Sequence, residues 1–149
     1  LPISGVFQTT YGDETAFVFG ENGGVVALAR NRNAEQSALL CRSAPPYEKW
    51  ERTSLDRNVG SPMLAYWGNF LIAGGRRSIT DDDPSTVLYW LQEEKLVEAL
   101  VLESGGDCSY PGFVEIDGRR ALVSYYSSHE GSGEPLFPAS VYVAELELE

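Results

Sequence analysis

Histidine and cysteine are scarce in this sequence, which has one histidine and two cysteines among 149 residues. No cysteine pair or histidine has the spacing of zinc ligands. Because Cys41 and Cys108 lie far apart, we expect two free thiols rather than a disulfide framework. The acidic run at 81–83 lacks the alternating ligands of a calcium loop and precedes Pro84, which favours a solvated turn. The sequence therefore predicts no metal site and no cofactor.

Basic residues are also few, with 11 Lys and Arg against 22 Asp and Glu and a net charge of −11. Such a charge repels phosphate backbones and anionic lipids, so we expect no nucleic acid and no membrane as partner. No apolar run approaches the ~20 residues that a membrane span needs. The N-terminal stretch LPISGVF lacks the basic and long apolar regions of a secretory signal. We expect a soluble protein of unknown compartment.

Three segments share one pattern, an apolar run on either side of a turn that contains glycine. They start at residues 15, 61 and 110 and read TAFVFGENGGVVALAR, SPMLAYWGNFLIAGGR and YPGFVEIDGRRALVSY. Each predicts a strand, a turn and a second strand. One such unit cannot bury its own apolar face, and repeats at this interval are typical of propeller blades or another repeat array.

Apolar runs separated by Gly, Pro, Asn and Asp continue between these segments, which predicts an all-β protein. The best helix candidate, LQEEKLVEAL at 91–100, also fits two strands joined by a charged turn at 92–95. We expect a half β-propeller of three four-stranded blades at about 12–56, 60–104 and 107–149. The predicted strands are 15–20, 24–30, 37–42, 50–55, 61–67, 70–76, 85–91, 95–103, 110–116, 119–126 and 139–148.

The third blade lacks a fourth strand in this scheme. The spare strand-like segment ISGVFQTTY at 3–11 has the position of the outer strand of a neighbouring or partner blade. A stack of three blades also leaves two blade faces uncovered, and large exposed apolar faces indicate an interface. We therefore expect either a homodimer that completes a six-bladed ring, with 3–11 filling the partner's last blade, or association with a separate complementary half.

In a four-stranded blade, the connection into the innermost strand and the loop between the second and third strands lie on one face of the ring. Arginines there suit an anionic ligand, because guanidinium binds carboxylate bidentately, and a glutamate beside a tyrosine can accept the phenolic proton. Strand-end arginines also serve as solvated or structural ion-pair residues, and a tyrosine before proline can simply pack. The candidates on this rim are Glu14, Arg30, Arg76, Arg77, Tyr110, His129 and Glu130.

Several segments resemble the sialidases and sialidase-like propellers. YGDETAFVFGENGGVVALARNRN with SALLCRSAPPYEKW is similar to the stretch in which a catalytic Glu opens a hairpin, an Arg closes it and a degenerate Asp-box with a Trp follows. SPMLAYWGNFLIAGGRR resembles the next blade, which carries the third arginine of the substrate-carboxylate triad. GDCSYPGFVEIDGRRALVSYY resembles the last blade, which carries the nucleophilic tyrosine, and SYPGFV with YYSSHEG resembles bacterial sialidase-like proteins more than well-studied sialidases.

The resemblance implies roles for five of the candidates. Tyr110 corresponds to the nucleophile, Glu14 to its base, and Arg30 with Arg76 or Arg77 to arginines that hold a substrate carboxylate. The matched region is the C-terminal half of a six-bladed fold, and no segment matches the first arginine or the acid/base Asp. We therefore expect a non-catalytic module that binds glycans or anions, such as an acidic sugar, or serves assembly. The alternatives are a sialidase-type glycoside hydrolase and an inactive fragment that needs a partner half.

Overall fold

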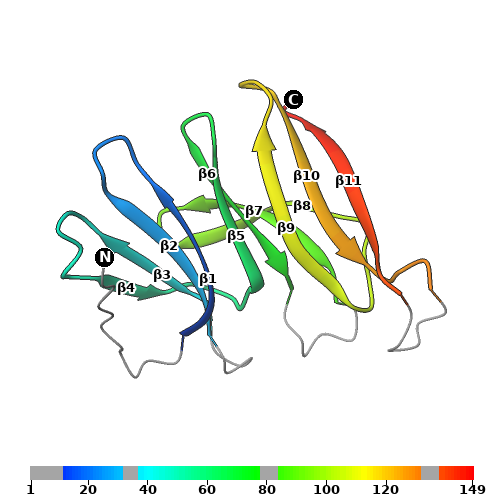
Figure 1. Cartoon of the computed structure of the whole chain (residues 1–149), viewed down its shortest axis with the longest axis horizontal. Helices are drawn as coiled ribbons and strands as arrows, with labels where there is room; N and C mark the ends of the chain where they lie inside the picture. Colours follow the sequence, from blue (N-terminus) through cyan, green and yellow to red (C-terminus); the bar gives the residue numbers. More distant parts are fainter. Residues whose placement is uncertain (1–11, 32–36, 78–83, 132–137) are drawn as a thin grey trace, which may run out of the picture.

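The computed structural model describes residues 12–31, 37–77, 84–131 and 138–149 (Figure 1). These residues form eleven strands in three antiparallel sheets, and each sheet keeps its strands in chain order. Blade 1 contains β1 (Gly12–Phe19), β2 (Val25–Asn31), β3 (Leu39–Ser43) and β4 (Glu51–Ser54). Blade 2 contains β5 (Gly60–Trp67), β6 (Phe70–Arg76), β7 (Thr86–Gln92) and β8 (Lys95–Val101). Blade 3 contains β9 (Cys108–Glu115), β10 (Arg120–Ser127) and β11 (Ser140–Glu147).

The predicted all-β half-propeller is confirmed. All eleven expected strands are present, and the stretch 91–100 forms the end of β7, a tight turn and most of β8 rather than a helix. Blade 3 has three strands among the described residues, as its sequence indicates. The expected outer strand at 3–11 and the acidic run at 81–83 both lie outside the described residues. Within the described ranges, no helix is long and apolar enough to cross a membrane.

Two hydrophobic cores hold the blades together, one between each neighbouring pair. Alternate residues of blade 1, such as Leu28 and Leu40, pack on Val87 and Tyr89 of blade 2. The other face of blade 2 packs on blade 3, where the Trp67 ring lies 5.5 Å from Phe113, centroid to centroid. Because side chains alternate along a strand, blade 2 buries apolar residues on both faces, whereas blades 1 and 3 each bury one face against a neighbour.

The innermost strands β1, β5 and β9 lie side by side, and each contains one additional residue near its start. Two residues of β1 oppose Arg30, two of β5 oppose Gly75, and two of β9 oppose Tyr125. This two-against-one pairing is a β-bulge, which re-aims side chains and is frequent next to functional sites. The bulges lie at one rim of the half-ring, where β2, β6 and β10 end (Figure 1).

Two glycines near the end of β6 leave room for the strand and core atoms beside them at this rim. A Cβ at Gly75, opposite the bulge of β5, would lie 2.5 Å from the Gly60 carbonyl oxygen and 2.5 Å from Val59 Cγ1. A Cβ at Gly74 would lie 2.9 Å from side-chain atoms of Met63 and of Leu88. A side chain at Gly75 would therefore displace the start of β5, and one at Gly74 would displace the Met63 and Leu88 side chains in the core between blades 2 and 3.

Candidate functional site

The three bulges bring residues from three blades together at the rim. Glu14 lies in the bulge of β1, Ser61 in that of β5 and Tyr110 in that of β9. Ser61 and Tyr110 both have a φ of 48°, an uncommon conformation for residues other than glycine. Each precedes a proline, which has no N–H and therefore fits a bulge position that makes no ladder hydrogen bond.

The Glu14 carboxylate is the centre of this cluster. Its Oε2 accepts hydrogen bonds of 2.9 Å from Arg30 Nη1 and from the Ser61 amide. Its Oε1 accepts one of 3.3 Å from the Ser61 hydroxyl and a short one from the Tyr110 hydroxyl. One carboxylate thus joins an arginine, a serine and a tyrosine from three different blades.

These contacts keep Glu14 ionised at neutral pH. Partial burial of the carboxylate raises its pKa, but the hydrogen bonds from Tyr110, Arg30 and the Ser61 amide, with the positive charge of Arg30, outweigh burial and lower the pKa below its ordinary value. The Tyr110 ring, in contrast, is 62% exposed at the rim. The ionised Glu14 carboxylate therefore lies behind the solvent-exposed Tyr110 side chain and accepts its hydrogen bond.

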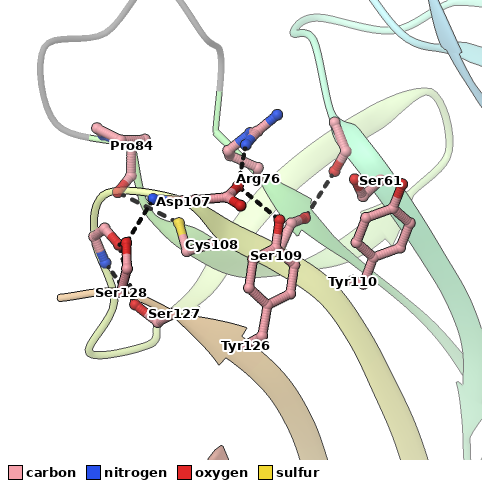
Figure 2. A network of polar contacts seen from close by, with 12 residues as sticks. Ser61, Arg76, Pro84, Asp107, Cys108, Ser109, Tyr110, Tyr126, Ser127 and Ser128 are labelled. Atoms are coloured by element: carbon pink, nitrogen blue, oxygen red, sulfur yellow. Dashed lines mark hydrogen bonds and ion pairs between the residues drawn. The ribbon is translucent and has the colours of Figure 1, made fainter. Parts of the chain in front are cut away.

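A second group adjoins the first through two stacked rings (Figure 2). The Tyr110 and Tyr126 rings lie 6.0 Å apart at an interplanar angle of 27°. The Tyr126 hydroxyl donates a 2.8 Å hydrogen bond to Asp107 Oδ1, which also pairs with Arg76 Nη1 at 3.3 Å. Burial, together with the hydrogen bond to Asp107 and its negative charge, strongly raises the pKa of Tyr126. The Asp107 carboxylate is therefore a shared acceptor for Arg76 and Tyr126.

Two consecutive arginines of blade 2 face opposite ways. Arg76 points toward blade 3 and Asp107, and its side chain is 20% exposed. The Arg77 guanidinium lies 2.8 Å from Glu98 of the outer strand β8, and its charge also acts on the Tyr89 phenol in the core between blades 1 and 2. Of the two arginines, Arg76 joins the tyrosine cluster, and Arg77 belongs to the outer part of its blade.

His129 and Glu130 lie in the loop after β10, beside the cluster rather than in it. The His129 Nδ1 is 2.8 Å from the Ser127 hydroxyl, and its ring lies 4.8 Å from that of Tyr142. Partial burial raises the pKa of Tyr142, and the neighbouring Glu130 raises it further. The structure thus brings Glu14, Arg30 and Tyr110 together, places Arg76 next to them, and directs the other three candidates elsewhere.

Sequence reasoning missed Ser61, Asp107 and Tyr126. A signal for Ser61 was present, because Ser61-Pro62 and Tyr110-Pro111 begin two of the inner strands in the same way. Asp107 and Tyr126 carried no comparable signal. Among the described residues, no group of three His, Cys, Asp or Glu side chains is arranged to hold a metal ion. The described residues of this rim include two arginines, two carboxylates and two phenols.

Comparisons with solved structures agree with the fold. A protein of unknown function from Dyadobacter fermentans superposes with a TM-score of 0.72 at 20% identity, over 93% of this chain and 38% of that one. An α-L-arabinanase of Penicillium chrysogenum, solved with arabinobiose, gives 0.68 at 13% identity, over 95% and 47%. The GH93 α-L-arabinofuranosidase of Fusarium graminearum, also with arabinobiose, gives 0.66 at 10% identity, over 92% and 45%.

No protein-family model and no curated protein sequence matches the chain. The chain spans less than half the length of the three solved structures named above. At these identities the likeness concerns the fold, a propeller architecture that the arabinanase and the arabinofuranosidase share. The resemblance drawn from the sequence is supported at that level, a glycosidase-like propeller, and the finer assignment to sialidases is a proposal.

Proposed function

We propose that this chain is a sialidase-like propeller half whose rim binds an acidic sugar without turning it over. The observation that carries the proposal is the meeting of Arg30, Glu14 and the exposed Tyr110 on one rim, with Arg76 beside them. Guanidinium groups bind carboxylates through paired, charge-assisted hydrogen bonds. An exposed tyrosine ring beside them offers an apolar surface for a sugar face and a hydroxyl for its polar edge.

The two arginines are suited to a ligand carboxylate because they are held in place but reachable. Their side chains are 19% and 20% exposed, respectively, and each is fixed by one carboxylate, Glu14 or Asp107. Asp107 is 66% exposed, so its pair with Arg76 is a solvated contact of small net stability that a ligand carboxylate can replace. The carbohydrate class is further supported by analogy with two enzymes of similar fold that were solved with arabinobiose.

Absence of turnover follows from the matched segments. The family's first arginine and acid/base Asp have no counterpart in the sequence, so a leaving group would lack its proton donor. We therefore propose binding without catalysis, in which Arg30 and Arg76 bind the carboxylate of the ligand.

Titration calorimetry with a matched pair of ligands tests this proposal. The methyl glycoside of N-acetylneuraminic acid carries the carboxylate, and its methyl ester differs only in having that charge removed. We expect heat of binding for the acid, at least tenfold weaker binding of the ester, and loss of binding in Arg30→Gln. Equal affinity for acid and ester, or no binding of either, would refute the proposal.

One observation favours a second function, sialidase-type hydrolysis. The Tyr110 hydroxyl already donates a hydrogen bond to the ionised Glu14, as a phenol nucleophile with its base requires. In this reaction Tyr110 Oη attacks the anomeric carbon, its proton passes to Glu14, and the bond to the aglycone breaks, with a phenolate aglycone leaving as the anion and so needing no proton donor. Water then attacks the anomeric carbon and releases one proton to the solvent, the bond to Tyr110 Oη breaks, and the proton on Glu14 returns to the phenolate of Tyr110. A fluorogenic sialoside measures it, with Tyr110→Phe as the matched variant. Release of the fluorophore by the native chain and its loss in the variant would establish hydrolysis; equal rates in both would exclude this role for Tyr110.

A further inference from the structure

Arg76 has only one guanidinium edge on which a ligand carboxylate can bind through two hydrogen bonds. An arginine offers such an edge either from Nε and Nη2 or from Nη1 and Nη2. Arg76 Nε is buried and has no hydrogen-bond partner among the described residues, so the first edge is closed to a ligand. The edge of Nη1 and Nη2 remains, and Asp107 Oδ1 lies 3.3 Å from Nη1 (Figure 2).

We propose that Asp107 is an internal competitor of the ligand and determines how tightly the rim binds an acidic sugar. Its carboxylate holds the Arg76 edge that a ligand carboxylate needs, so it must turn away before the ligand can bind both nitrogens. Asp107 therefore lowers the affinity for acidic ligands and leaves that for neutral ligands unchanged, an opposing element of the kind that tunes specificity. This inference rests on the proposed function, because it concerns the same ligand.

Asp107, rather than Glu14, is the carboxylate that gives way. Glu14 accepts four hydrogen bonds, two from Ser61 and one each from Arg30 and Tyr110, and its side chain is 25% exposed. Asp107 accepts two from the described residues, both on Oδ1, and its side chain is 66% exposed. An exposed ion pair is weak because water solvates both partners, so a ligand carboxylate can replace Asp107 at little cost.

The change is confined to one side chain, because the main chain of Asp107 is fixed. The Asp107 amide donates a 2.9 Å hydrogen bond to Ser128 Oγ, and the Ser128 amide donates one of 3.1 Å to the Asp107 carbonyl oxygen. The Tyr126 hydroxyl donates to the Asp107 carboxylate at 2.8 Å, so this carboxylate keeps a partner when it releases Arg76. Rotation of the Asp107 side chain therefore opens the Arg76 edge without moving the loop.

Titration calorimetry on Asp107→Asn tests the proposal, with the methyl glycoside of N-acetylneuraminic acid and its methyl ester as ligands. The amide keeps the size of the side chain and removes the competing charge. Since an exposed ion pair is weak, we expect the variant to bind the acid about three- to fivefold more tightly than the native chain does. The affinity for the ester should change less than about twofold, because the ester has no charge for which Asp107 competes.

Two further variants show whether the gain comes from the Arg76 edge. Asp107→Ser also removes the carboxylate and should bind the acid more tightly by a similar factor. Glu98→Gln is the matched control, because it removes the same charge from the neighbouring pair, in which Glu98 lies 2.8 Å from Arg77. It should leave both affinities within about twofold of the native values. An equal gain in Glu98→Gln would mean that overall charge is responsible and would overturn the proposal.

The remaining outcomes separate this inference from the proposed function. If the native chain prefers the acid but neither Asp107 variant binds it more tightly, Asp107 merely orients Arg76 and the inference is wrong, whereas the proposed function stands. If only the Asp107 variants bind the acid, the competition is supported and the proposed function fails for the native chain. No binding by any of these chains would overturn both.

Discussion

The Tyr110 hydroxyl donates a hydrogen bond to the Glu14 carboxylate across 96 residues of chain. The contact joins the first blade to the third and passes over Ser61 of the second, which donates to the same carboxylate. A site built from three inner strands can form only when all three blades have packed. Its integrity therefore reports on the tertiary structure of the whole half-ring.

The first prediction concerns Glu14 and pH. Because its pKa is lowered in the folded state, its ionised form stabilises the fold at pH values above its ordinary pKa of 4.5, and this contribution is lost as pH falls through the lower folded value. Glu14→Gln should lower the free energy of unfolding at pH 7 by about 1–2 kcal/mol, since it weakens charged hydrogen bonds of a partly buried group. Urea unfolding at pH 7 and at pH 3 measures the change.

The pH dependence of the difference in unfolding free energy between the native chain and Glu14→Gln decides this prediction. It should shrink at pH 3, where the native carboxyl approaches its protonated form and resembles the amide. A difference between the native chain and Glu14→Gln that stays constant over this range would show that the charge of Glu14 contributes nothing to stability.

The second prediction separates the two consecutive arginines. Arg76→Ala should weaken binding of an acidic sugar by roughly tenfold, the loss expected from one charge-assisted contact of about 1.4 kcal/mol. Arg77→Ala is its matched control, because Arg77 pairs with Glu98 on the outer strand and should leave the affinity within about twofold. Calorimetry on both variants measures this, and a greater loss in Arg77→Ala would place the ligand elsewhere.

The third prediction concerns the glycine opposite the bulge of β5. In Gly75→Ala the new Cβ meets the Gly60 carbonyl oxygen and Val59 at 2.5 Å, so the variant should lose about 1–3 kcal/mol of stability. Gly118→Ala is the control, since no atom lies within 4 Å of a Cβ built there. Thermal unfolding followed by circular dichroism compares them. Equal melting temperatures would mean that the bulge adjusts without strain.

The fourth prediction concerns the thiols. Cys41 and Cys108 are free and buried in different blades, and burial raises the pKa of both. Both should react slowly with a disulfide reagent such as dithionitrobenzoate in the native chain, since the thiolate is the reactive form. In denaturant, two thiols per chain should react at once. Rapid reaction of either thiol under native conditions would contradict the burial seen here.

The strand content was readable from the sequence because each blade repeats the same alternation of apolar runs and turns. The alignment of the three repeated segments with one another, however, differs from the structure by one residue at their ends. The sequence match sets Arg30, Arg76 and Tyr125 side by side, whereas the hydrogen-bond register makes Arg76 equivalent to Asn31 and Tyr126. The turns differ in length, two residues after Trp67 against five after Phe19, and local pattern does not reveal how the strands absorb that difference.

Part of the site was also predictable, because the order of the strands in a blade fixes which strand ends share a rim. Topology alone assigns Glu14, Arg30 and Tyr110 to one rim, and their contacts follow from the bulges. The direction of Arg77 depended on strand register, because a shift by one residue reverses the face of a side chain. Asp107 lies in a loop between blades, where neither periodicity nor spacing indicates that it accepts hydrogen bonds from Arg76 and Tyr126.

The bulge formed by Tyr110 and Pro111 separates recognition from architecture. Tyr110 is 62% exposed at the rim, whereas Phe113 of the same strand packs against blade 2, so a change at position 110 alters what the rim offers a ligand while this core contact stays in place. The half-ring is therefore a natural scaffold for protein engineering: saturating position 110 would diversify ligand preference beside a Ser61 that is buried and unchanged.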